Sequence, residues 1–161
     1  MNHRAWLRLG AKTLHDIASI GFGGALAACL VINLTANLAA PVEFMAARQV
    51  FTAIAQYLLV PAIAVVMVSG LIAIAATRGY RDAGWAWLKA VMGMSVFVAT
   101  LMVVGAAGEH GELAAAASAA DLATLQRLLH SERNTLWLLI ALSAANVVLA
   151  VWRPKLMIKI R

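Results

Sequence analysis

Residues 51–77 read FTAIAQYLLVPAIAVVMVSGLIAIAAT, a stretch with no acidic, basic or histidine side chain. A helix needs about 20 apolar residues to cross the hydrocarbon core of a bilayer. Three more stretches come close to that requirement, Leu14–Leu38, Trp85–Ala107 and Leu136–Trp152. Backbone groups inside a bilayer must be paired within their own segment, so all four stretches are predicted to be helices.

The composition supports this interpretation over a soluble fold. The chain of 161 residues is 63% hydrophobic and only 12% charged, more apolar surface than a soluble domain of this size can bury. Four spans in one short chain predict a single all-α domain over residues 1–161, an integral membrane four-helix bundle with its surface in the lipid bilayer. The lone cysteine, Cys29, excludes an internal disulfide. The first stretch is too long for a cleaved signal peptide, so we expect it to be a true span.

Charged residues are distributed unevenly between the two sides of the predicted membrane topology. Ten of the thirteen Lys and Arg residues precede the first stretch, follow the last, or lie at the turn between the second and third or at the start of the third. The other three, Arg48, Arg127 and Arg133, share the opposite side with five of the seven acidic residues. Because basic residues stay on the cytoplasmic side, we expect both termini in the cytoplasm and the chain in a bacterial inner membrane. The net charge of +6 then reflects topology and attraction to anionic lipid, not a nucleic-acid partner.

The one long connection, residues 108–134, carries a helical pattern of its own. Leucines recur at helical spacing from Leu122 to Leu129, with polar residues on the other faces. We therefore predict an outer amphipathic helix over about residues 118–132, between the third and fourth spans. It is expected either to lie on the outer membrane surface or to cap the bundle.

Ionisable residues at membrane depth are costly and are therefore candidate functional residues. His15, with its neighbour Asp16, lies near the cytoplasmic edge of the first span, on a helix face shared with Ser19, Cys29 and Asn33. One interpretation is that His15 supplies a neutral imidazole as an axial ligand to haem iron, with Asp16 or Ser19 as its hydrogen-bonding partner. The alternative is that His15 merely lies at the membrane rim.

Lys89 opens the third span on the same side as His15. The first and third spans run in the same direction, so the two residues lie at a similar depth and can face each other. Lys89 is a candidate catalytic and cofactor-binding residue, as a partner for a haem propionate or in proton transfer. The alternative is that it extends its amine to the lipid headgroups beside Trp87.

Two further histidines are weaker candidates. His110, flanked by Glu109 and Glu112, has the ligand types of a metal site, and copper is the metal considered. His130 lies on the outer amphipathic segment, within possible reach of His110. Neither can share an iron with His15, which lies across the membrane.

The order of short motifs resembles a superfamily of small bacterial four-helix membrane proteins. A basic start runs into KTLH at residues 12–15, the second stretch holds Pro61 and then Ser69-Gly70, and the third opens with WLKA at 87–90. The superfamily includes the copper-resistance-D-like proteins, an uncharacterised family of predicted integral membrane proteins, and the membrane protoporphyrinogen oxidases. The resemblance covers about residues 8–107.

The resemblance implies a b-type haem. In the protoporphyrinogen-oxidase branch a first-span His and a third-span Lys are the signature residues, and these roles map to His15 and Lys89. The usual Thr-Gly of the second span is Ser69-Gly70 here. The aromatic-rich sequence of that branch is missing from the first span, where Phe22 is the only aromatic residue between Ile17 and Leu30. This departure favours haem binding over the oxidase activity itself.

Three functions from different classes follow. The first is a b-haem-binding membrane protein with a redox role, electron transfer with quinone or tetrapyrrole oxidation. The second is a non-enzymatic accessory or structural subunit of a larger membrane complex or a homo-oligomer, in which the small-residue faces at Gly21/Gly24 and Ser69/Gly70/Ala73 make the contacts. The third is copper handling at His110. No Walker loop, zincin motif or CxxC motif is present.

Overall fold

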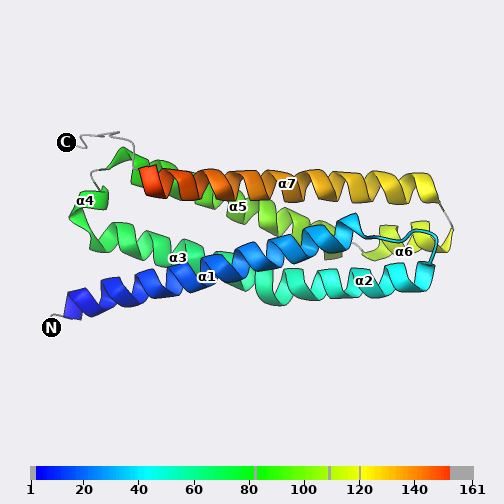
Figure 1. Ribbon diagram of the computed structural model, residues 1–161, viewed down its shortest axis with the longest axis horizontal. Coiled ribbons are helices and arrows are strands. Elements are labelled where there is room, and N and C mark those ends of the chain that lie inside the picture. Colours follow the sequence, from blue (N-terminus) through cyan, green and yellow to red (C-terminus); the bar gives the residue numbers. More distant parts are fainter. Residues whose placement is uncertain (1–2, 82, 109, 120, 153–161) are drawn as a thin grey trace.

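The computed structural model describes residues 3–81, 83–108, 110–119 and 121–152, and every element it contains there is a helix. Seven α-helices and one π-helical turn follow one another along the chain (Figure 1): α1 His3–Leu34, α2 Pro41–Ile54, η1 Ala55–Leu59, α3 Val60–Ala76, α4 Arg78–Arg81, α5 Gly84–Gly108, α6 His110–Ser118 and α7 Leu122–Trp152. The predicted all-α class is confirmed.

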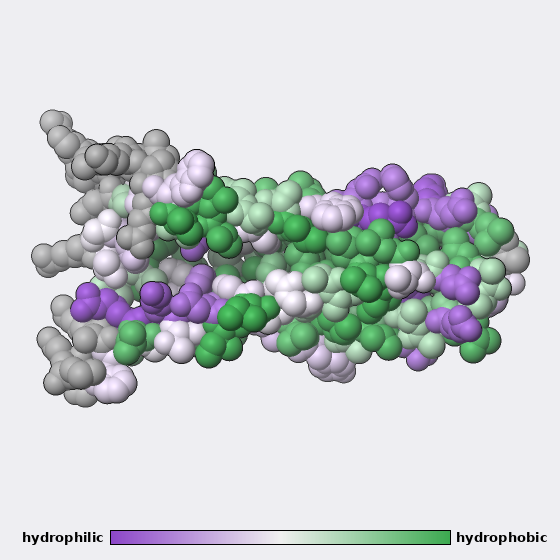
Figure 2. Space-filling view, in the orientation of Figure 1, coloured by the Kyte–Doolittle hydropathy of each residue, from purple (hydrophilic) through white to green (hydrophobic). Residues whose placement is uncertain are grey.

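Four helical segments are long and apolar enough to cross a membrane, in agreement with the four predicted spans: Trp6–Leu34, Pro41–Ala76, Gly84–Gly105 and Leu122–Trp152. The chain is therefore a multi-pass membrane protein whose apolar helices contact lipid. Figure 2 shows apolar side chains over the middle of one face, with hydrophilic side chains gathered toward the two ends.

The long helices pack side by side in chain order. α1 lies against α3 and α7, and α5 lies against the same two helices, so the four helices form a closed ring of contacts. The start of α1, the short α4 and the end of α7 lie at one end of the molecule, and α6 with the start of α2 lies at the other (Figure 1). We call these the α4 end and the α6 end.

The second span is continuous through α2, η1 and α3, and its π-helical turn has a physical cause. Pro61 has no backbone N–H, and its ring excludes the α-helical hydrogen bond to the carbonyl of Tyr57. The helix widens over Ala55–Leu59, immediately before this proline, instead of breaking. The structure thus accommodates Pro61 with this widened turn.

Two helical segments are longer than a bilayer core requires. Residues 41–76 span 36 residues and α7 spans 31. At 1.5 Å per residue these lengths are about 54 Å and about 46 Å, against about 30 Å of hydrocarbon. Both therefore extend beyond the apolar layer.

The extra length forms a separate packed layer at the α6 end, which we call the cap: α2, α6 and the first part of α7, residues 122–132. Its core consists of Phe44 from α2, Leu113 and Ala116 from α6, and Leu125 and Leu129 from α7. The main core is a different cluster, centred on Phe22, Phe51, Leu59, Val96 and Leu136.

The predicted amphipathic helix over 118–132 is therefore built differently from the expectation. Ser118 ends α6, and residues from Leu122 onward are the first turns of α7, continuous with the fourth span. Leu125 and Leu129 are buried against α2 and α6, so this segment caps the helices and does not lie flat on a membrane. Asp121 caps its start by accepting a hydrogen bond from the backbone N–H of Thr124 at 3.1 Å. Hydrogen bonds from Thr124 also hold the pKa of the Asp121 carboxyl below its usual range.

Replacing a buried leucine of the cap should cost far more than replacing an exposed one. Leu129→Ala leaves a cavity and should lower the free energy of unfolding by about 2–5 kcal/mol. Leu122, on the same helix but 52% exposed, is the matched control, and Leu122→Ala should change it by less than about 0.5 kcal/mol. Thermal unfolding of the purified protein in detergent compares the two, and equal shifts would contradict the cap.

Candidate functional site

His15 is held against α3 by its Nδ1 atom. This nitrogen lies 3.0 Å from the carbonyl oxygen of Val66 and 3.0 Å from the hydroxyl oxygen of Ser69. A carbonyl only accepts hydrogen bonds, and the Ser69 hydroxyl itself donates to the carbonyl of Val65 at 2.6 Å, so Nδ1 carries the proton. In the neutral ring, Nε2 is then the atom with the lone pair.

Close approach of α1 and α3 makes this contact possible. A Cβ atom added at Gly70 would lie 3.5 Å from Cε1 of His15, so the ring packs directly against the backbone of α3. Ser69 is buried at this contact. The Ser69/Gly70 face, considered above as a surface for an external partner, is therefore occupied by α1 of the same chain.

The predicted partners of the imidazole are not at its nitrogens. Ser19 is exposed, and its hydroxyl donates to the backbone carbonyl of His15 at 2.8 Å. Asp16 is also exposed and acts on His15 only through its charge. Val66 and Ser69 of α3 take the place that sequence reasoning gave to Asp16 or Ser19.

Lys89 is half-buried on α5, near enough to His15 and Asp16 for their charges to interact. The structure therefore brings the two main predicted site residues into one region, as their similar depth suggested. In the described contacts, His15 and Lys89 interact through their charges and share no hydrogen bond.

The fully buried positions near this region hold small residues. Toward the α4 end the main core stops at about Phe22, Ile63, Val96 and Leu139. Beyond it, the buried residues in the described part of the chain are all small: Ser69, Gly84, Ala86 and Gly93. The larger side chains of this half, such as Val66 and Met67, are only partly buried.

Two polar side chains of α7 point into the same half. Asn146 approaches Gly93 of α5, where an added Cβ would lie 3.7 Å from its Nδ2 and 3.1 Å from Sδ of Met67. The Asn146 Oδ1 atom and the hydroxyl oxygen of Ser143 are buried and have no hydrogen-bond partner in the described structure. All four long helices thus contribute a polar side chain to this half, which we call the His15 region.

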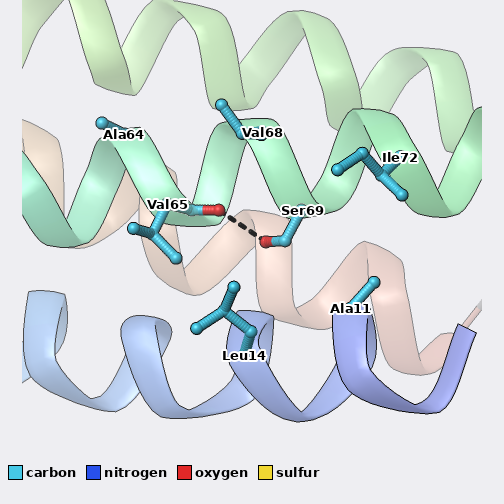
Figure 3. Close-up of a pocket in the computed structure, with 7 residues that line it drawn as sticks. All are labelled: Ala11, Leu14, Ala64, Val65, Val68, Ser69 and Ile72. Atoms are coloured by element: carbon cyan, nitrogen blue, oxygen red, sulfur yellow. Dashed lines mark hydrogen bonds between the residues drawn. The ribbon is translucent and has the colours of Figure 1, made fainter. Parts of the chain in front are cut away.

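A shallow apolar groove runs beside this region on the outer surface of α1 and α3 (Figure 3). It has a volume of about 260 Å³, and Ala11 and Leu14 face Val65, Val68 and Ile72 across it. Ser69 is the residue that the groove shares with the His15 contact.

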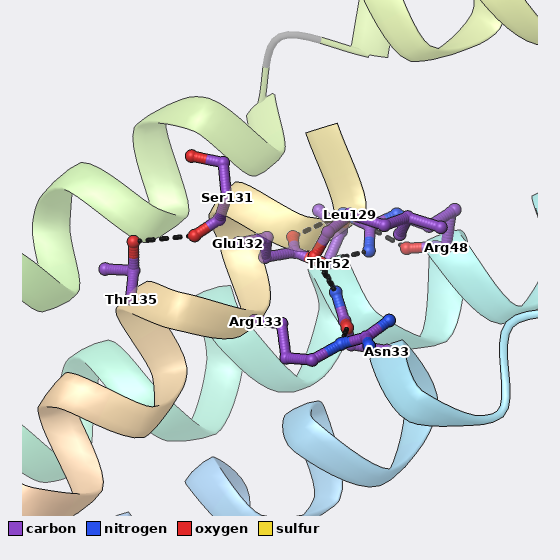
Figure 4. Close-up of polar contacts among 8 residues, drawn as sticks. All are labelled: Asn33, Arg48, Thr52, Leu129, Ser131, Glu132, Arg133 and Thr135. Atoms are coloured by element: carbon purple, nitrogen blue, oxygen red, sulfur yellow. Dashed lines mark hydrogen bonds and ion pairs between the residues drawn. The ribbon is translucent and has the colours of Figure 1, made fainter. Parts of the chain in front are cut away.

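A second polar cluster lies at the boundary between the cap and the main core (Figure 4). The Arg48 guanidinium donates two hydrogen bonds of 2.7 Å, one to each carboxylate oxygen of Glu132. Their side chains are 4% and 14% exposed, respectively. The Arg48 guanidinium also stacks over the Phe51 ring, 4.3 Å from its centroid.

Asn33 extends this cluster to α1. Its amide nitrogen donates to Glu132 at 2.7 Å and to the Leu129 carbonyl at 3.1 Å. Its amide oxygen accepts a 3.0 Å hydrogen bond from Nε of Arg133. We call Asn33, Arg48, Glu132 and Arg133 the boundary cluster, and it joins α1, α2 and α7.

Sequence reasoning did not find the boundary cluster as a unit. It placed Asn33 on the His15 face of the first span, and Arg48 and Glu132 served only to assign topology. One signal in the sequence could have indicated it. Arg48 lies three residues before the apolar run that begins at Phe51, and an arginine buried at such a position needs an acidic partner.

The weaker metal candidates remain separate from the His15 region. His130 is exposed on the cap, and the side chain of His110, at the start of α6, lies outside the described residues. Within the part of the chain that is described, no three His, Cys, Asp or Glu side chains gather as a metal site.

Comparisons with protein-family models, with curated proteins and with solved structures found no match to this chain.

Breaking the buried ion pair should destabilise the protein strongly. Arg48→Met leaves the Glu132 carboxylate buried without its partner and should lower the free energy of unfolding by about 3–5 kcal/mol. The double variant Arg48→Met/Glu132→Leu removes both charges and should recover most of the loss. Unfolding in detergent measures this, with the exposed Arg127→Met as control. A single variant as stable as the control would contradict the assigned role of the pair.

Proposed function

We propose that the chain is a b-haem-binding protein of a bacterial inner membrane with a redox role, and that His15 is the axial ligand. The observation that carries this proposal is the Nδ1 contact with Val66, which leaves Nε2 with its lone pair. Metal-ligating histidines commonly donate their other ring nitrogen to a backbone carbonyl or carboxylate, which fixes the tautomer and the ring orientation. His15 has this arrangement.

The residues around His15 fit the group. The buried positions of this half are small, and the unpartnered oxygen atoms of Ser143 and Asn146 favour a polar occupant. When bound, haem would supply one-electron chemistry, for electron transfer with a quinone or for tetrapyrrole oxidation.

The chain's own residues would then have separate tasks. His15 would hold the iron, and Ser69 and Val66 would keep its ring in place. Lys89 would offer a positive charge to a propionate or a proton to a substrate.

We further propose that the helices form a four-helix bundle with both termini in the cytoplasm and the cap outside. The strongly basic residues 78 and 81 belong to the α4 end, and the acid-rich connection belongs to the α6 end. The positive-inside rule then assigns the α4 end to the cytoplasm.

A second candidate is the non-enzymatic accessory subunit or homo-oligomer. Gly21 and Gly24 support it, because a Cβ added at either position would meet nothing within 4 Å. This part of α1 is open to the close approach of another helix. Copper handling has no comparable observation in its favour.

The test of haem binding is a reduced-minus-oxidised absorbance spectrum of the detergent-purified protein, with pyridine haemochrome quantification. We expect a b-type signal near one haem per chain, and its loss in His15→Ala while the protein still inserts and folds. His130→Ala, at the opposite end, is the control and should keep the signal. A flat spectrum from folded wild-type protein produced with ample haem would contradict the proposal and favour the accessory subunit.

Topology is tested by labelling single cysteines in a Cys29→Ala background. Ala119→Cys, just after α6 beside the cap, should react with a membrane-impermeant maleimide in intact cells that admit the reagent to the periplasm. Gly79→Cys in α4 should react only after the inner membrane is opened. Both positions are exposed, so access and not burial decides the result. The reverse pattern would place the termini outside.

A further inference from the structure

Arg133 is the surplus cation of the boundary cluster. Arg48 forms a two-bond ion pair with Glu132, which matches the single negative charge of the cluster. Arg133 makes no ion pair with any described residue, and its one described hydrogen bond uses Nε. Its two terminal nitrogens, the part of a guanidinium that matches a phosphate or carboxylate, remain available.

The buried residue Asn33 fixes the position of the Arg133 side chain. Asn33, which is 1% exposed, accepts the Nε hydrogen bond and is itself held by Leu129 and Glu132. In Figure 4 the guanidinium of Arg133 lies against Asn33. A charged group held in place loses less conformational entropy when it binds a ligand.

The surroundings indicate which ligand. Arg133 lies where the cap meets the main core, the level at which the apolar layer of the molecule ends. One turn further along the same face of α7, toward the apolar layer, Trp137 is 52% exposed, and on α1 Leu34 follows Asn33 and is 51% exposed. An exposed Trp beside an Arg at this level is typical of a membrane interface, where the indole ring lies among glycerol and headgroups.

We propose that Arg133 and Trp137 form a binding site for one anionic phospholipid. The Arg133 guanidinium binds the phosphate, the indole of Trp137 packs on the glycerol region, and the acyl chains follow the exposed apolar surface of α1 and α7. A soluble anion would use the charge of Arg133 but gain nothing from Trp137 and Leu34. The site lies at the opposite end from His15 and does not depend on haem.

Native mass spectrometry of delipidated protein titrated with dioleoyl phosphatidylglycerol tests this. We expect Arg133→Gln to weaken the first binding step by about tenfold, the effect of losing one charge-assisted contact. Arg127→Gln, an exposed arginine on the same helix, should leave it unchanged. Trp137→Leu should weaken binding by about threefold, and the exposed Trp152→Leu should have no effect.

Three results would overturn the proposal. One is wild-type affinity in folded Arg133→Gln, and another is an equal loss in Arg127→Gln, which would show nonspecific attraction. The third is displacement of the lipid by millimolar inorganic phosphate, which would make this a site for soluble anions. Arg133→Lys keeps the charge but loses the two-pronged geometry, and it should also bind the lipid more weakly. It serves as the second variant if Arg133→Gln does not fold.

Discussion

Lipid offers no hydrogen-bonding partner, so polar groups in the spanning part of this chain must be satisfied within the protein or by what it binds. This constraint explains the helices, and it explains why the chain passes Pro61 through a π-helical turn that keeps the helix unbroken. It also explains the boundary cluster. Arg48 and Glu132 are tolerated at low exposure because each satisfies the charge of the other, and because Asn33 supplies a further donor.

The two ends of the molecule meet this constraint differently. At the α6 end, polar groups form a network beneath a packed apolar cap, and it connects α1, α2 and α7. In this network Nε of Arg48 is buried without a described partner. At the α4 end, buried positions are small, and the oxygens of Ser143 and Asn146 have no described partner. A connected network gives rigidity, whereas convergent unpaired polar groups are suited to a ligand site.

The sequence was sufficient for the spans, because a hydropathy run such as 51–77 depends only on local composition. It also predicted that His15 and Lys89 lie at a similar depth, and the structure brings them near each other. It could not find Val66 as the partner of His15, because a backbone carbonyl has no signature in the sequence. It placed Leu125 and Leu129 on an apolar helix face, but Leu122 of the same predicted face is exposed. It also did not reveal that α7 runs unbroken from Leu122 to Trp152. The continuity of α7 depends on tertiary contacts, because Leu125 and Leu129 pack against apolar residues of α2 and α6.

The rigid end and the open end are connected by the same helices, and this has a consequence for the His15 region. A redox cofactor changes charge by one unit, and the surrounding dipoles should reorganise little when it does so. The ring of His15 meets this need because Nδ1 is bound to α3, and α3 is continuous with α2, which the boundary cluster anchors. One continuous helical segment therefore joins the His15 region to the boundary cluster. Each buried oxygen left unpaired lowers the stability of the protein. The unpaired oxygens of Ser143 and Asn146 are the observation that favours cofactor binding over an accessory role.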